Sequence, residues 1–379
     1  MLCELSMENF KCFQSLTLSL GGLNVFTGLN GMGKSTVIQS LLLLKQSKEQ
    51  TLSFDRIFLN GRYVSLGKGE DVLYEGNQRE EIRFRLKELT PNKSFRLVWD
   101  IQVRYHAEGS VLPCTQSMFL TGAAGNSHID LGRFQSFQHG FEYLNAERLA
   151  PRTVYENAST FDDNNSLLGI NGQYTAHYLS AHSGDMIERA IPGGETTTLR
   201  GALQFWMNQI SPNVRLNITE IPHTDLSQLA YYYMEPGLPK SNDYRPTNVG
   251  FGISYALPIV TAALKAAPQS ILILENPEAH LHPRGQRKMG ELLAWCANRG
   301  AQVFVETHSD HVLNGIRISV KKKQIPRKAV RLFFFDKAVR GDAAEHFVQT
   351  PEVLEDGRLS DWPEGFFDEW EKAQDEILW

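Results

Sequence analysis

Continuous apolar runs and helical patterns follow one another near both ends of the sequence. Residues 23–26, 271–274 and 302–305 are short apolar runs, typical of strands buried on both faces of a parallel sheet. The first run is followed by a predicted helix at residues 35–44, and the second by an amphipathic helix at residues 286–296. Strands that alternate with helices in this way predict an α/β fold.

The middle of the sequence has a different period. From about residue 63 to residue 142 apolar and polar positions alternate, as in half-buried antiparallel strands. Turn signals stand at Pro91-Asn92 and at residues 122–125. The alternating positions are Ile82, Phe84 and Leu86 in one run, and Phe95, Leu97, Trp99, Ile101 and Val103 in another. We expect an antiparallel β layer here.

Residues 153–246 are less regular. They contain the loop-like stretch 162–166 and one predicted helix at residues 198–210. We interpret this region as an inserted, mainly helical lobe.

Composition narrows the class of protein. A chain of 379 residues exceeds the size at which one core usually stops growing, so an inserted lobe or a second domain is expected. The net charge of −5 argues against a surface that coats nucleic acid throughout. The four cysteines show no paired spacing, which suits reduced thiols, and neither a leader nor an apolar run of ~18 residues is visible. The expected location is cytoplasmic, without membrane contact.

The most specific motif is the stretch from Gly28 to Thr36, which matches the phosphate-loop pattern G-x-x-x-x-G-K-S/T. Glycines let backbone N–H groups turn toward a phosphate, Lys34 would reach the β- and γ-phosphates, and the Ser35 hydroxyl would hold Mg²⁺. ATP and Mg²⁺ are therefore the expected cofactors. The candidate nucleotide-binding residues are Asn30, Gly31, Met32, Gly33, Lys34, Ser35 and Thr36. Nearby Phe10 and Phe13 are either sheet core or a contact for the adenine ring.

A second glycine-rich turn precedes the predicted helix at residues 256–266. Its candidate residues Gly250, Gly252 and Ser254 would open a helix whose N-terminus attracts anions. One nucleotide rarely needs two such sites from one chain. This turn is therefore a candidate cap for the γ-phosphate bound by a second copy.

Candidate catalytic residues follow the last two apolar runs. Glu275 ends the first run, where an α/β sheet places its site, and it is the candidate Mg²⁺-side acid. Glu306 ends the second run and is followed by His308, which is placed to bond a γ-phosphate or an attacking water. Glu278, His280 and His282 admit another interpretation, as metal ligands on one face of an extended segment. Arg148 either faces the phosphates or a partner, or forms a surface salt bridge.

The order of these motifs resembles the ABC-type ATPases, and more closely the branch with the overcoming-lysogenisation-defect (OLD), RecF and SMC proteins. The stretches 8–13 and 361–368 resemble a bacterial subgroup of stand-alone ATPases with an uncharacterised C-terminal segment. The resemblance implies a head-to-tail dimer around two ATP molecules, each held by the phosphate loop of one chain and residues 248–254 of the other. It also implies that residues 279–283 cross the dimer interface and that His308 is the switch histidine.

The sequence departs from this family at one position. Where the family carries Asp-Glu, this chain has Glu275-Asn276, and an amide cannot accept a proton as a carboxylate does. Either Glu278 or Glu306 supplies the missing acid, or hydrolysis is slow and ATP acts as a clamp. The expected organisation is an ATPase domain formed by residues 1–152 and 247–340, the lobe at 153–246 and an acidic, aromatic tail at 341–379.

A basic cluster precedes the acidic tail and is either a solvated face or a contact for DNA. It consists of Arg317, Lys321, Lys322, Lys323, Arg327, Lys328 and Arg331. The functional hypothesis is an ATP-hydrolysing motor or sensor of a defence or DNA-maintenance system, as a homodimer or higher oligomer. It would carry no nuclease chemistry and would need a separate effector such as a nuclease. The alternative is a nucleotide-gated scaffold with negligible turnover.

Overall fold

The computed structural model describes the chain in two compact units. The described residues are 1–51, 53–76, 80–89, 96–121, 136–138, 140–158, 168–189, 191–340 and 343–378. Unit 1 comprises Met1–His139, Val330–Glu352 and Asp361–Trp379, and unit 2 comprises Gly140–Ala329 and Val353–Ser360. These boundaries differ from the functional division expected from sequence, which stays a prediction.

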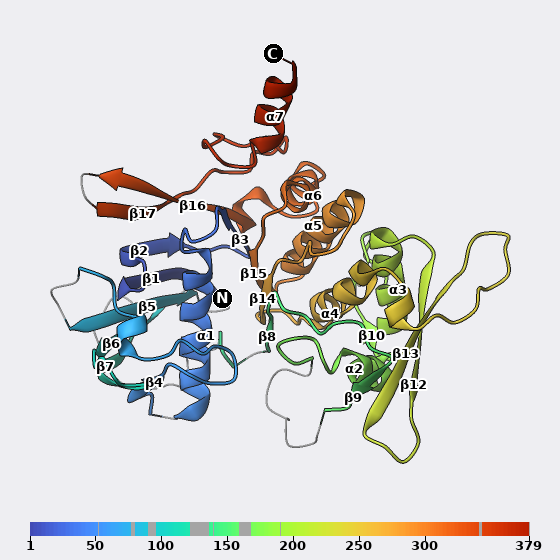
Figure 1. The fold of residues 1–379 in the computed structure, drawn as a ribbon, viewed down its shortest axis with the longest axis horizontal. Helices are drawn as coiled ribbons and strands as arrows, with labels where there is room; N and C mark the ends of the chain where they lie inside the picture. Colours follow the sequence, from blue (N-terminus) through green and yellow to red (C-terminus); the bar gives the residue numbers. More distant parts are fainter. Residues whose placement is uncertain are drawn as a thin grey trace. The chain divides into compact units, whose positions relative to one another are not determined.

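Unit 1 contains the antiparallel layer (Figure 1). In sheet order its strands are β2 (Phe13–Ser19), β1 (Leu2–Phe10), β5 (Glu81–Leu89), β6 (Arg96–Arg104), β7 (Val111–Thr121) and β4 (Arg56–Phe58). The alternation seen in the sequence is the register of this sheet, since Phe84 lies opposite Ile101 and Leu86 opposite Trp99. All four side chains are buried. The turns predicted at residues 91–92 and 122–125 lie outside the described residues.

A second set of strands in unit 1 carries the phosphate loop. Strand β3 (Leu23–Gly28) pairs in parallel with β16 (Val330–Arg340), which pairs antiparallel with β17 (Ala343–Gln349). Helix α1 (Lys34–Gln50) runs beyond the predicted end at residue 44. It continues because its next polar side chains are buried with partners: Lys45 donates to the Phe137 carbonyl, and Gln46 donates to the Phe58 carbonyl.

Unit 2 is built on three parallel strands. Strand β14 (Ile271–Glu275) pairs with β15 (Gln302–Glu306) on one side and β8 (Phe141–Leu144) on the other. Glu275 lies directly opposite Glu306, so the register brings both strand-end acids to one edge. Helices α4 (Phe251–Lys265), α5 (Pro283–Asn298) and α6 (Asp310–Lys321) belong to the same unit.

The lobe at residues 153–246 corrects one prediction. It holds helices α2 (Thr175–His182) and α3 (Leu199–Ile210), but also strands β9 (Val154–Glu156), β10 (Met186–Ile187), β11 (Thr197–Thr198), β12 (Val214–Glu220) and β13 (Leu226–Tyr233). Figure 1 shows β12 and β13 as a long hairpin near α2 and α3. The expectation of a mainly helical lobe was wrong, because Leu229 and Tyr231 alternate with exposed or half-buried neighbours and form a strand. Residues 162–166 lie outside the described residues.

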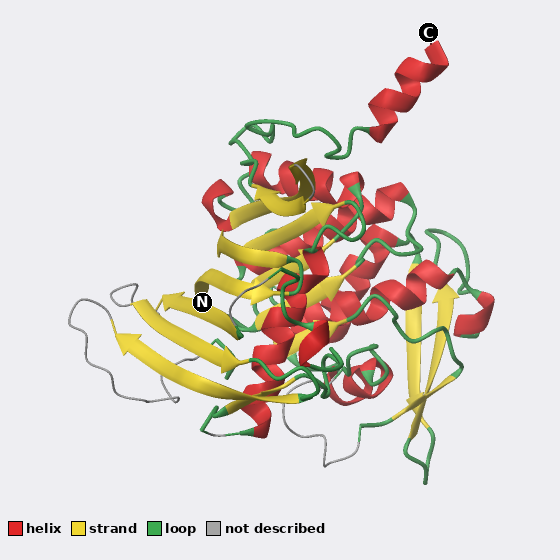
Figure 2. Cartoon of the chain, turned by 60° about the vertical axis from the view of Figure 1, so that its left-hand side comes forward, coloured by secondary structure: helices red, strands yellow, loops and turns green. Residues whose placement is uncertain are grey.

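The C-terminal segment ends in helix α7 (Glu369–Leu378), at the label C in Figure 2. Before it, Phe366 is buried and packs against Phe334 of β16 at a ring-centroid distance of 5.3 Å, while Trp362 remains partly exposed. Short 3₁₀ helices lie at Gly69–Asp71, Pro246–Asn248 and Arg327–Ala329. Across the described ranges, none of the helices combines the length and the apolar character that crossing a membrane requires. The α/β fold with an antiparallel layer is confirmed.

Candidate functional site

The phosphate loop has the backbone conformation that its glycines predict. Gly31 and Gly33 have φ angles of +78° and +99°, in the left-handed region that side chains disfavour. A Cβ atom on Gly33 would meet Cys12 Sγ and the Phe13 ring at 2.7 Å, whereas one on Gly31 would meet nothing within 4 Å. The loop is therefore tightly packed at Gly33 and open at Gly31, as a cradle for an anion requires.

Lys34 and Ser35 begin helix α1 directly after this loop. The Lys34 ammonium donates hydrogen bonds to the carbonyls of Gly28 at 2.9 Å and Leu29 at 2.8 Å, so its buried side chain follows the loop. Ser35 and Asn30 are exposed, and the first turn of α1 has no acidic residue. The cationic side chain, the open N-terminus and the exposed hydroxyl fit a nucleotide phosphate with Mg²⁺. Met32 and Thr36 are buried beside them.

The two aromatic candidates for an adenine contact are core residues. Phe10 is buried and packs edge-on against Phe84, and Phe13 packs against Phe335. The sheet-core interpretation of both is confirmed. The structure thus assigns these rings to the packing of unit 1.

In unit 2, Glu275 ends β14 with its carboxylate held by two donors. Tyr143 Oη donates to Oε1 at 2.9 Å, and the Ala146 N–H donates to Oε2 at 3.2 Å. Burial raises the pKa of Glu275, and these hydrogen bonds oppose the shift. Tyr143 and Ala146 were missed by the sequence reasoning, because only the parallel pairing of β8 with β14 brings them to this carboxylate.

Glu278 is joined to the segment that follows β15. Its Oε2 accepts from Thr307 Oγ1 at 2.8 Å, and its Oε1 accepts from the His308 N–H at 2.7 Å. Burial raises the pKa of this carboxyl as well, against the effect of these donors. Glu278 therefore forms one cluster with Thr307 and His308, which lie 29 and 30 positions later in the sequence. The exposed His308 lies at the surface of this cluster. A carboxylate has about four acceptor positions, so two donors leave room for a water or substrate proton.

Asn276 stands where the ABC-type ATPases that the sequence resembles carry their second acid. Its N–H donates to the Glu306 carbonyl at 2.9 Å, and its φ angle of +45° is left-handed, which asparagine tolerates better than most residues. Its Oδ1 atom is buried without a hydrogen-bond partner among the described residues. Of the two candidate acids, Glu306 is buried, and Glu278 accepts the hydrogen bond from the His308 N–H.

Arg148 corrects another prediction. It is buried, and its guanidinium donates to the carbonyls of Glu275 at 2.9 Å and Asn276 at 2.6 Å, so the surface salt bridge is wrong. Burial lowers its pKa to about 10, against the charges of Glu278 and Glu275. Arg148 Nε and Asn145 Oδ1 are further buried atoms for which the described residues offer no hydrogen-bond partner. Arg148 therefore holds the backbone at Glu275 and Asn276 in place.

Helix α4 begins at Phe251, five residues before the predicted start at residue 256, so Gly252 and Ser254 lie in its first turn and not in a loop before it. Gly250 is the N-cap and is exposed, and a Cβ atom there would meet nothing within 4 Å. At Gly252 a Cβ atom would lie 2.4 Å from the His280 carbonyl, so this glycine permits close packing against residues 279–283. Ser254 is only 8% exposed and its hydroxyl lies 3.5 Å from Tyr231 Oη, so its side chain points into the unit.

The structure does not support the metal-ligand alternative for Glu278, His280 and His282. Within the part of the chain that the structure describes, no three His, Cys, Asp or Glu side chains are grouped to hold a metal ion. His280 instead lies against Tyr255, with ring centroids 4.7 Å apart, and His282 caps helix α5. All four cysteines are free thiols.

Some members of the basic cluster form hydrogen bonds or an ion pair, and the others are exposed. Arg317 donates to the Gly357 carbonyl at 2.7 Å, and Arg331, in unit 1, donates to the Val330 carbonyl. Arg327 is half-buried, 4.0 Å from Glu355. The exposed members are Lys321, Lys322, Lys323 and Lys328.

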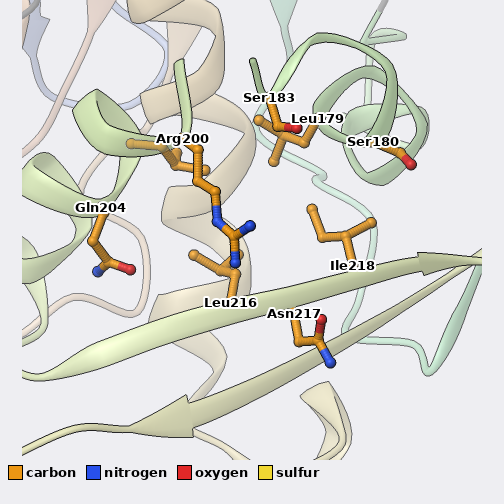
Figure 3. A pocket seen from close by; sticks show the side chains of 9 residues that line it. Leu179, Ser180, Ser183, Arg200, Gln204, Leu216, Asn217 and Ile218 are labelled. Carbon is orange, nitrogen blue, oxygen red and sulfur yellow. The ribbon is translucent and has the colours of Figure 1, made fainter. Parts of the chain in front are cut away.

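Unit 2 also has a pocket of about 110 Å³ between α2, α3 and β12, with the Arg200 side chain extending toward Leu216 and Asn217 (Figure 3). Ser180 at its edge donates to Glu220, and Asn217 donates to Asp243. The carboxylates of Glu220 and Asp243 near the pocket offset the positive charge of Arg200. None of the predicted site residues lines this pocket.

Three family models match parts of the chain. The model described as "AAA ATPase domain" matches residues 1–165, and "AAA domain, putative AbiEii toxin, Type IV TA system" matches residues 234–314. "Protein of unknown function (DUF3696)" matches residues 325–377. The OLD nuclease of Thermus scotoductus is 23% identical over 324 residues, which are 82% of this chain and 59% of that protein. The chain thus spans less than two thirds of that relative.

Solved structures share the fold. An Smc head bound to the C-winged helix domain of ScpA has a TM-score of 0.55 at 11% identity, covering 92% of this chain and 97% of the other. An Smc head with an extended coiled coil, bound to the C-terminal domain of ScpA derived from Pyrococcus furiosus, has a TM-score of 0.50 at 11% identity and covers 100% and 99%. The matches confirm the predicted resemblance to P-loop ATPases of the OLD and SMC branch, with an uncharacterised C-terminal segment.

Proposed function

We propose that this chain binds ATP with Mg²⁺ and hydrolyses it, as an ABC-type ATPase that dimerises around two nucleotides. The observation that carries the proposal is the phosphate loop: left-handed Gly31 and Gly33 lead into a helix that starts with Lys34 and the exposed Ser35. Backbone N–H groups, a helix N-terminus and one ammonium together suit a triphosphate.

Specific roles extend this proposal. Lys34 binds the β- and γ-phosphates, while Ser35 and Glu275 are the Mg²⁺-side residues. Glu278 is the acid that replaces the missing carboxylate at position 276, with Glu306 as the second candidate. Glu278 is favoured because its carboxylate bonds the His308 N–H, next to the proposed switch histidine. The exposed N-terminus of α4, with Gly250, Gly252 and Ser254, caps the nucleotide of the other copy through its backbone.

The alternative, a nucleotide-gated scaffold with negligible turnover, is favoured by the amide at Asn276. It is also favoured by the two donors that already hold Glu278, because they oppose the effect of burial on its pKa and make the carboxylate a weaker base than burial alone would. In this alternative ATP stabilises a dimer and is released slowly.

Phosphate release by the purified chain separates the two functions. Steady release over many turnovers per chain, absent in Lys34→Ala, supports the ATPase. Retention of bound nucleotide with less than one turnover per chain supports the scaffold. Failure to bind ATP at all contradicts both.

We further propose that the ATPase is the motor or sensor of a defence or DNA-maintenance system whose effector is a separate protein, such as a nuclease. The description of the matched AbiEii-type model supports a defence setting. The proposal above uses the strand-end acids Glu275 and Glu306 and the loop residue Glu278 for ATP, which supports a separate effector. The test incubates the pure chain with DNA or RNA, ATP and Mg²⁺ or Mn²⁺. Cleavage that follows the protein peak and persists in Lys34→Ala would refute this part.

A further inference from the structure

Unit 2 contains a second cavity, of about 290 Å³, which the proposed ATPase function does not use. It is formed by Arg189, residues 191–194, helices α3 and α5, and the turn after α6. The lining side chains relevant here are Trp206, Trp295, Arg299, Arg189, Lys323 and Glu291. Its volume is close to the lower end of the range for small-ligand sites.

Aromatic groups and an arginine form one side of the cavity. Trp206 is buried and its ring lies 5.4 Å from that of Trp295, at an angle of 53°. The Arg299 guanidinium lies 4.8 Å from the Trp295 ring centroid, in a cation–π contact. The half-buried Trp295 indole and the Arg299 guanidinium offer flat, polarizable surfaces of the kind on which nucleic-acid bases stack, while the buried Trp206 packs against Trp295.

The charge of the lining is positive. Arg189, Arg299 and Lys323 contribute three cations, and Glu291 is the acid among the lining residues. Glu291 is already paired with Arg287 at 2.7 Å and Lys288 at 2.8 Å, so it does not neutralise the cavity. A ligand with both an aromatic ring and an anionic group would match this lining.

The cations beside the cavity are not explained by stabilisation of the C-terminal ends of the neighbouring helices. Lysines are favourable where unbonded carbonyls give a helix C-terminus its negative charge. At the end of α6, however, the N–H groups of Lys322, Lys323 and Gln324 bond the carbonyls of Ile318, Val320 and Ser319. At the end of α5, the N–H groups of Arg299 and Gly300 likewise bond carbonyls of the last helical turn. Lys323 also continues an exposed run with Lys321 and Lys322.

We propose that this cavity binds a nucleotide, with the base against Trp295 and Arg299 and the phosphate near Lys323 and Arg189. The ligand is either a free mononucleotide or one unit of a single-stranded nucleic acid whose backbone follows Lys321, Lys322 and Lys323. The site is separate from the phosphate loop and does not require Lys34.

The test measures fluorescence anisotropy of a labelled 12-nucleotide thymidine strand, and quenching of tryptophan emission by thymidine monophosphate. Trp295→Ala should weaken binding about tenfold or more, since stacking contributes ~1–3 kcal/mol per base. Lys323→Glu, an exposed change expected to leave folding intact, should weaken strand binding and lower its salt dependence by about one ion. Lys240→Glu, at an exposed lysine of the same unit outside both the basic cluster and the cavity lining, is the charge-matched control and should bind as the wild type does. A duplex of the same sequence should bind more weakly, because its bases are already stacked.

The two sources of the ligand give different results. Strand binding that depends on Trp295 and Lys323 supports a single-stranded nucleic acid, and monophosphate binding without strand binding supports a free nucleotide. The proposal is overturned if neither probe binds, or if binding is indifferent to both substitutions. Binding that is lost in Lys34→Ala would also overturn it, because the probe would then occupy the phosphate loop.

Discussion

The guanidinium of Arg148 donates a 2.6 Å hydrogen bond to the carbonyl of Asn276, and the same group bonds the carbonyl of Glu275. This buried cation therefore holds the backbone at the two residues where strand β14 ends and the following loop begins. Asn276 has a left-handed backbone there, a conformation that needs support from its surroundings. Arg148 supplies that support from a segment 128 positions away in sequence.

Substitution of Arg148 tests this arrangement. Arg148→Lys keeps a cation but loses the planar fork, so buried carbonyls remain without donors. We expect the free energy of unfolding to fall by about 2–4 kcal/mol in urea titrations. The exposed neighbour Arg152→Ala is the matched control and should change it by less than about 0.5 kcal/mol. Equal effects of both changes would contradict the structural role of Arg148.

Lys34→Ala should abolish measurable ATP binding in calorimetry. The substitution removes the charge-assisted contacts to the β- and γ-phosphates, a loss of about 100-fold or more in affinity. Lys68→Ala, an exposed lysine of the same unit that pairs with Glu108, should bind ATP as the wild type does. Unchanged affinity in Lys34→Ala would remove the basis of the proposed function.

Glu278→Gln should lower ATP turnover by about 10²–10⁴-fold while ATP binding is retained, because general-base assistance has this magnitude. The control is Asn276→Gly, which preserves the left-handed backbone at φ +45° and should change turnover only a few fold. Small effects of both changes would instead direct attention to Glu306.

The raised pKa of Glu278 predicts how stability depends on pH. Burial raises this pKa in the folded chain above its unfolded value, so the folded state keeps a proton that the unfolded state releases. The contribution of Glu278 is therefore largest below the ordinary carboxyl pKa of ~4.3 and is lost as pH rises through the folded pKa. Melting curves between pH ~4 and pH ~8 should show a shallower fall for Glu278→Gln than for the wild type. A steeper fall would mean that the folded pKa is lowered.

Dimerisation is best tested at Gly250. Gly250→Arg places a long side chain in open space at the exposed start of α4, so it should leave folding intact and prevent ATP-dependent dimers in light scattering. Ser254→Arg is a poorer probe, because Ser254 is buried against Tyr231. The control, Gly184→Arg, adds the same side chain in open space at another exposed glycine of unit 2 and should dimerise normally. The same mass with and without ATP in the wild type would refute the dimer.

Local patterns in the sequence were sufficient for the buried strands β3, β14 and β15, for β5 and β6 of the antiparallel layer, for the helices α1, α3, α4 and α5, and for the phosphate loop. The glycines of the loop are set by φ angles that only glycine adopts readily, and the buried strands by continuous apolar runs. The alternation at Ile82, Phe84 and Leu86 likewise predicts its own strand, because side chains on a strand have a period of two. These features depend on residues that are neighbours along the chain, so they can be predicted without knowledge of the fold.

Tertiary structure decided the partners of each functional group. The roles of Tyr143 and Arg148 depend on the parallel pairing of β8 with β14, and the bond from His308 to Glu278 depends on the loop after β15. The lobe was assigned wrongly because its hairpin gains stability from packing that no local pattern records. The cavity at Trp206 and Trp295 likewise joins α3 to α5 across 89 positions. Contacts of this kind are set by packing between distant segments, so the sequence alone left them open.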